Sequence, residues 1–96
     1  MTKKLHPDIL RILNWVRVDF DIDLPDLPKG SIKNEHRCPL AHVLQMKYPK
    51  AGVGNQTYCL EGYSAQATRW RVLPPFAQVF VGEFDHGLWP EYEEDV

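Results

Sequence analysis

The chain has 96 residues, of which 44% are hydrophobic and 25% charged, and its formal net charge is −2. This length and balance indicate one globular domain, residues 1–96, and exclude a chain that is disordered throughout. No apolar run approaches the roughly 20 residues that cross a membrane, and the basic start leads into Pro7 rather than into an apolar signal core. We therefore expect a cytoplasmic protein without a membrane span.

Charge is divided unevenly along the chain. Residues 1–50 carry a net charge of +3 and residues 51–96 carry −5. A protein that binds duplex nucleic acid normally presents a dense basic face. The segment Arg69-Trp70-Arg71 could stack on and clamp a single strand, but the overall acidity argues against a nucleic-acid partner. We expect the acidic tail, residues 91–96, to lie in solvent.

The first predicted element is a helix over residues 7–19. Pro7 suits the first helical position, and Asp8 suits the positive end of the helix dipole. Apolar residues that recur at helical spacing predict its buried stripe: Ile9, Ile12, Leu13, Val16 and Phe20.

Two prolines interrupt the segment that follows. Pro25 and Pro28 lack the amide donor that a helix or a central strand requires. Residues 21–37 therefore predict a long surface loop, and a loop of this length in a small domain is often functional.

A second helix is predicted over residues 39–48. Pro39 suits its first position, which makes Cys38 the N-cap, and Pro49 ends it. Residues 51–55 are rich in glycine and predict a turn.

Alternating residues over 56–73 predict an antiparallel hairpin whose turn lies at 62–65. We expect Trp70 and Val72 to face the core, and Arg69 and Arg71 to face solvent or a partner.

A third helix is predicted over residues 75–86. One side of it is traced by Phe76, Val79, Phe80, Glu83 and Phe84, with Val81 flanking. Phe80 is expected to pack on Trp70, and Gly87 to adopt the left-handed conformation of a helix end. The order of elements predicts an α+β fold, with about three helices packed on a short antiparallel hairpin or small sheet.

Two cysteines and two histidines are weak candidate metal ligands. Cys38 and His42 lie four apart on one helix, and His36 and Cys59 could complete a zinc set. No CxxC or HxxxH pair is present, so we expect no metal and no cofactor. The cysteines are expected to be free thiols, and Cys38 to be a buried cap rather than a reactive thiolate.

Two short motifs resemble a known group of proteins. The motifs are Cys38-Pro39-Leu40-Ala41-His42-Val43-Leu44, and Leu73-Pro74-Pro75 followed by Phe80-Val81-Gly82-Glu83-Phe84-Asp85-His86-Gly87. They are similar to the CP-x-A-x-x-L, LP and F-D-x-G pattern of small uncharacterised proteins from actinobacteriophages and actinobacteria. The resemblance covers about residues 38–92 and implies a compact domain in the cytoplasm of a bacterial host. It brings no catalytic residues.

Two functions are compatible with these observations. The first is a non-catalytic protein-binding module, a phage-encoded accessory factor that modulates a host or phage protein. It is favoured because no catalytic constellation is present and because aromatic residues are numerous for so small a core. The alternative is a binder of a small molecule or nucleotide, or a thiol-dependent enzyme that uses Cys38.

The residues expected to bind a partner lie in the loop and near the C-terminus. Apolar loop residues and aromatic residues beside an acidic run would form apolar anchors with a charged rim. An alternative is that these side chains cover the domain's own core. The candidates are Leu24, Leu27, Ile32, Trp89 and Tyr92.

Overall fold

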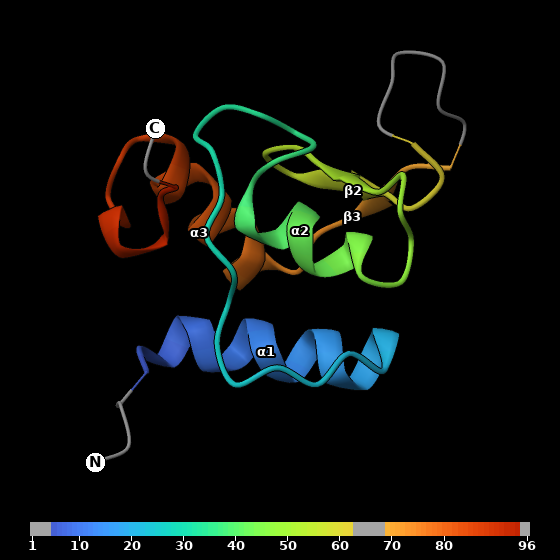
Figure 1. Ribbon diagram of the computed structural model, residues 1–96, viewed down its shortest axis with the longest axis horizontal. Coiled ribbons are helices and arrows are strands. Elements are labelled where there is room, and N and C mark those ends of the chain that lie inside the picture. Colours follow the sequence, from blue (N-terminus) through green and yellow to red (C-terminus); the bar gives the residue numbers. More distant parts are fainter. Residues whose placement is uncertain (1–4, 63–68, 95–96) are drawn as a thin grey trace.

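The computed structural model describes residues 5–62 and 69–94 (Figure 1). Three helices and a three-stranded antiparallel sheet form an α+β fold, which confirms the predicted class. The turn expected within the hairpin lies mostly outside the described residues. In chain order the elements are α1 (Pro7–Phe20), α2 (Pro39–Gln45), β1 (Gly52–Val53), β2 (Thr57–Cys59), β3 (Arg71–Val72), α3 (Pro75–Asp85) and the 3-10 helix η1 (Pro90–Tyr92).

Helix α1 begins at Pro7, as its sequence predicts. The amide of Asp8 donates a hydrogen bond of 3.1 Å to Nδ1 of His6, the N-cap residue. All five residues of the predicted apolar stripe are buried. The helix ends where Asp21 adopts a left-handed conformation, with a φ of 56°.

Helix α2 is shorter than predicted, because it ends at Gln45 rather than at residue 48. Pro49 disfavours a helical conformation at Tyr48, so the last turn tightens, and the amides of Lys47 and Tyr48 both bond to the carbonyl of Leu44. The Gln45 side chain then ties this end of the helix to neighbouring loops through the carbonyls of His36 and Ala51.

The sheet has one strand more than the predicted hairpin. Residues 51–55, expected to form only a turn, contain β1, which pairs with β2 in the register Gly52↔Cys59. Glycine weakens a strand, so local propensity gives no sign of β1. Its pairing is supported by long-range contacts, among them a 2.7 Å hydrogen bond from the amide of Val53 to the carbonyl of Glu35.

The expectation that Trp70 and Val72 face the core is wrong, whereas Arg69 is exposed as expected. Trp70 and Val72 are 40% and 72% exposed, whereas Leu73 is buried. The register places Arg71 opposite Tyr58 and Val72 opposite Thr57. Because side chains alternate, pairing Arg71 with the buried Tyr58 turns Val72 to the other face of the sheet.

The predicted pair of Trp70 and Phe80 is therefore wrong. Phe80 is buried against aromatic rings that follow it in the chain, at centroid distances of 6.0 Å to Phe84, 5.2 Å to Trp89 and 6.1 Å to Tyr92. The buried side of α3 is also rotated from the expected one, since Val79 is 53% exposed. The residues that α3 buries are Ala77, Phe80, Val81 and Phe84. Gly87 follows the helix with a φ of 75°, as predicted.

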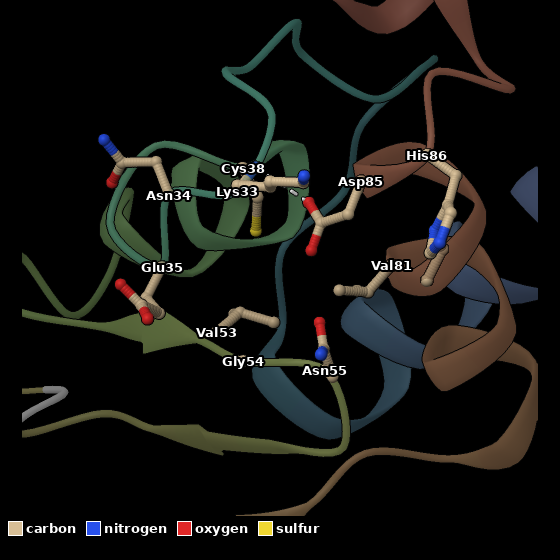
Figure 2. A pocket seen from close by; sticks show the side chains of 11 residues that line it. Lys33, Asn34, Glu35, Cys38, Val53, Gly54, Asn55, Val81, Asp85 and His86 are labelled. Atoms are coloured by element: carbon tan, nitrogen blue, oxygen red, sulfur yellow. Dashed lines mark hydrogen bonds between the residues drawn. The ribbon is translucent and has the colours of Figure 1, made fainter.

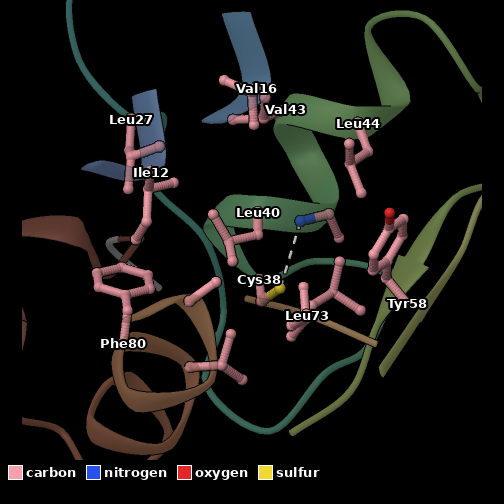
Figure 3. Close-up of a cluster of buried hydrophobic side chains, with 14 of the residues drawn as sticks. Ile12, Val16, Leu27, Cys38, Leu40, Val43, Leu44, Tyr58, Leu73 and Phe80 are labelled. Atoms are coloured by element: carbon pink, nitrogen blue, oxygen red, sulfur yellow. Dashed lines mark hydrogen bonds between the residues drawn. The ribbon is translucent and has the colours of Figure 1, made fainter. Parts of the chain in front are cut away.

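The core lies where the three helices meet the sheet (Figure 3). Figure 1 shows α1 along one side of the molecule with α2 beside it. Helix α1 packs against α2 and α3, and α2 packs on β1. Ile12, Leu40 and Phe80 meet in this core and are almost completely buried.

The C-terminal segment is fastened to the long loop rather than lying free in solvent, which corrects the expectation for residues 91–94. The amide of Gly30 donates to the carbonyl of Tyr92 over 2.8 Å, and the amide of Glu94 donates to the carbonyl of Gly30 over 2.9 Å. Gly30 and Glu93 thus form a parallel β-bridge. The Glu94 carboxylate also accepts from Arg37 at 2.9 Å and from Ser31 at 3.3 Å. These contacts join the acidic half of the chain to the basic half.

Candidate functional site

Cys38 caps α2, as the sequence predicts. The amide of Ala41 donates to its Sγ over 3.4 Å, and the residue is buried. Burial raises the pKa of the Cys38 thiol to about 12. The thiol is therefore protonated at neutral pH, which is the opposite of what an activated nucleophile requires.

The four candidate metal ligands do not form a site. His36 is exposed, and Cys59 is buried with its Sγ 3.6 Å from a carboxylate oxygen of Glu61. Nε2 of His42 lies 3.4 Å from the Glu94 carboxylate, a long electrostatic contact that becomes an ion pair when the ring is protonated. Within residues 5–62 and 69–94, no three His, Cys, Asp or Glu side chains are arranged to hold a metal ion. Both cysteines are free thiols.

The predicted partner-binding residues lie against the core. Leu27, Trp89 and Tyr92 are buried, and Leu24 and Ile32 are half-buried and pack on the core cluster. The alternative raised for them, that they cover the domain's own core, describes this placement. A role for these residues in binding a partner stays a prediction.

Trp89 and Tyr92 are held in place by specific contacts. The Trp89 ring packs at 5.2 Å from Phe80 and at 5.1 Å, edge to face, from His6. The hydroxyl of Tyr92 donates a 2.8 Å hydrogen bond to Asp26 in the long loop. The Tyr92 hydrogen bond belongs to the contacts between the long loop and the C-terminal segment, which we call the clasp, whereas Trp89 packs on His6 and on Phe80 of α3.

Apolar surface remains exposed in a different place, along the line where α1 meets the start of α3. Two adjoining hollows of about 400 and 290 Å³ lie there and share Arg11 and Phe76. We call this feature the α1–α3 groove. Val18 and Val79 lie in it and are 64% and 53% exposed. Its lining residues are Asp8, Arg11, Asn14, Trp15, Val18, Asp19, Pro75, Phe76 and Val79.

The groove has an aromatic floor and one acidic end. Trp15 is half-buried, with its ring edge-to-face against Phe20 at 5.3 Å and Tyr58 at 5.7 Å, so it is fixed in position. Asp19 lines the groove, and the exposed Asp21 and Asp23 follow it. In the part of the chain that the structure describes, none of these three carboxylates forms an ion pair.

A second concave feature is more enclosed and more polar (Figure 2). This cleft has a volume of about 390 Å³ and lies between residues 33–35, the β1–β2 turn and the C-terminal end of α3. Cys38 of the first motif and Asp85 of the second both line it, although they are far apart in the sequence. We call it the polar cleft.

Among the residues that line the two concave features, sequence reasoning assigned a possible binding role only to Cys38, as a weak metal ligand and in the alternative function. The spacing along α1 already leaves Val18 outside the buried stripe, whereas the exposure of Val79 depends on how α3 packs. The sequence contains one weak indication of the polar cleft. Asp85 and His86 belong to the F-D-x-G motif, which by itself predicts only the end of a helix.

Comparison of the chain with protein-family models, with curated proteins and with solved structures gives no match. The resemblance of the two motifs to actinobacteriophage proteins stays a prediction. Among the helices of the described residues, none is both long and apolar enough to cross a membrane.

Proposed function

We propose that the protein is a non-catalytic protein-binding module whose α1–α3 groove receives an apolar, basic segment of its partner. The observation that carries the proposal is the exposure of Val18 and Val79 in two adjoining hollows, one of which is also lined by the fixed Trp15. Contiguous apolar surface of this kind is typical of interaction sites. A buried, protonated Cys38 gives no comparable support to a thiol-dependent enzyme.

The charge around the groove supports a basic partner. Asp19 lines the groove and the exposed Asp21 and Asp23 follow it in the chain, whereas Arg11 is engaged by Asp8 at 3.3 Å. The groove therefore presents uncompensated negative charge to an approaching chain. Lysine or arginine residues flanking an apolar anchor would speed association with this surface and set its orientation.

In this proposal the partner is a host or phage protein, and the module acts in the bacterial cytoplasm as an accessory factor. The motif resemblance is the reason for proposing a host or phage protein as the partner. The groove is the reason for proposing that an apolar, basic segment of that partner binds.

Site-specific crosslinking tests the proposal. A photoreactive phenylalanine analogue replaces Val18 in one variant and Val79 in another, and each is illuminated in a bacterial lysate. The expected result is capture of the same partner from both positions, with excess unmodified protein abolishing the capture. Met46 and Leu88, which are 58% and 64% exposed and lie outside the groove, are the matched control positions. Equal capture from the control positions, or no specific capture from the groove, would contradict the proposal.

The charge component is tested separately. Replacing Asp19, Asp21 and Asp23 with asparagine should slow association with the captured partner and reduce its dependence on salt. An unchanged association rate would show that the acidic end does not face the partner.

A further inference from the structure

The polar cleft is held open by hydrogen bonds within the protein. The amide of Lys33 donates to Oδ1 of Asp85 over 2.9 Å, which ties the loop wall to α3. The amide of Val53 donates to the carbonyl of Glu35 over 2.7 Å, which ties the same wall to the sheet. A site whose walls are already fixed loses less entropy when a ligand binds.

The floor of the cleft is apolar and neutral. Val53 and Val81 are each 2% exposed, and the Cys38 side chain points into the same space (Figure 2). Its volume of about 390 Å³ lies at the lower end of the range for ligand sites, so the occupant is a small molecule.

The rim carries charged groups of both signs that form no ion pair with other described residues. Lys33 has no ion-pair partner in the described part of the chain, and neither does Glu35. Asp85 uses one carboxylate oxygen for the Lys33 amide and leaves the other available. His86 donates from Nδ1 to the carbonyl of Gly82 over 2.8 Å, so Nε2 of the neutral ring is an open acceptor.

Asp85 and Asn55 approach the cleft from opposite sides (Figure 2). A ligand between them can donate hydrogen bonds to both side-chain oxygens. A purely anionic ligand would meet the carboxylates of Glu35 and Asp85, and a purely cationic one would meet the ammonium of Lys33. A ligand that carries both charges satisfies both sides of the rim.

We infer that the polar cleft is a binding site for a small zwitterion of the free amino-acid type. Its ammonium group is received by Asp85 and Asn55, its carboxylate by Lys33, and its side chain lies over Val53 and Val81. This site is independent of the proposed partner groove and shares no lining residue with it.

Nuclear magnetic resonance titration tests the inference. The isotope-labelled protein is titrated with free amino acids at millimolar concentration, first mixed and then singly. The expected result is saturable shifts of the amides of Gly54, Asn55, Gly82 and Asp85. The N-acetyl derivative, which lacks the ammonium group, and the methyl ester, which lacks the carboxylate, should each bind about tenfold more weakly or worse. No saturable shift at these amides, or equal binding of both derivatives, overturns the inference.

Variants locate the two charged contacts. Asp85→Asn keeps an oxygen for the Lys33 amide while removing the charge, and Lys33→Met keeps the side-chain length while removing the ammonium group. Each should weaken binding of the free amino acid about tenfold. Lys29→Met, at an exposed lysine that does not line the cleft, should bind like the wild type. Undiminished binding of the amino acid by both cleft variants would overturn the proposed roles of Asp85 and Lys33. If a variant does not fold, the titrations with the N-acetyl derivative and the methyl ester test the inference instead.

Discussion

Gly30 lies so close to the start of α2 that a Cβ atom at this position would be 2.6 Å from the carbonyl carbon of Cys38. Real Cβ atoms do not approach backbone atoms this closely, so the loop and the helix touch without room for a side chain. The same residue bonds through its amide and its carbonyl to the C-terminal segment. The packing of the loop, the start of α2 and the C-terminal segment therefore depends on the absence of one methyl group.

Gly30→Ala should destabilise the protein by about 3 kcal/mol, because backbone atoms on both sides must move to admit the methyl group. Urea denaturation measures the change. Gly82→Ala is the matched control, since a Cβ there meets nothing within 4 Å and alanine favours the helix by about 0.5–1 kcal/mol. Equal stability of the Gly30 variant and the wild type would show that the loop does not pass so close to α2.

Phe80→Ala should cost about 3–5 kcal/mol, because the ring is buried among Phe84, Trp89 and Tyr92. Its neighbour Val79 is 53% exposed, so Val79→Ala should stay within about 0.5 kcal/mol of the wild type. Thermal melting distinguishes the two. The reverse ranking would mean that α3 presents its other face to the core.

Tyr92→Phe removes the hydroxyl that donates to Asp26 and leaves the ring in place. Burial and this hydrogen bond raise the pKa of Tyr92, so the hydroxyl remains a donor well above neutral pH. A loss of about 1–2 kcal/mol is expected from chemical denaturation. Tyr48→Phe should be nearly neutral, since the Tyr48 hydroxyl makes no hydrogen bond within the described residues. A neutral Tyr92 variant would place the C-terminal segment away from the loop.

Cys38→Ser should fold with a loss of about 1 kcal/mol or less, because serine is itself a good N-cap. The pH dependence of the free energy of unfolding is a more specific test of the burial of the thiol. The thiol pKa is raised from 9.0 to about 12 in the folded protein, so the unfolded chain ionises first. Stability is therefore complete below pH 9 and falls as pH rises toward 12. The fall should be smaller in the serine variant, and identical alkaline profiles would contradict the burial of this thiol.

Glu94→Gln should change the acid profile. The Arg37 guanidinium lowers the pKa of the Glu94 carboxyl, so its contribution to stability is present above the usual pKa of 4.5 and is lost as pH falls through the lowered value. The variant should melt at a lower temperature than the wild type near pH 7, and the difference should shrink toward pH 2. Glu91→Gln, at an exposed position outside the clasp, should retain the wild-type profile. The same loss of stability at every pH in the Glu94 variant would rule out the ion pair as its source.

Much of the local structure can be predicted from the sequence. Pro7, Pro39 and Pro75 each occupy the first helical position, Cys38 caps α2, and Gly87 adopts the left-handed conformation. These features depend on a residue and its nearest neighbours, because ring geometry and the lack of a Cβ restrict the backbone wherever such residues occur.

Contacts between segments that are distant in the sequence decide which apolar side chains are buried and where the two concave features lie. Trp70 and Leu73 are both apolar, and only the register of β3 on β2 selects Leu73 for the core. Trp89 and Tyr92 look like surface anchors beside an acidic run, yet both are buried: Tyr92 against the long loop, and Trp89 against His6 and Phe80. Neither the α1–α3 groove nor the polar cleft is built from one stretch of chain. Hydrophobic burial is not directional, so a sequence specifies which side chains can be buried, while tertiary packing decides which of them are.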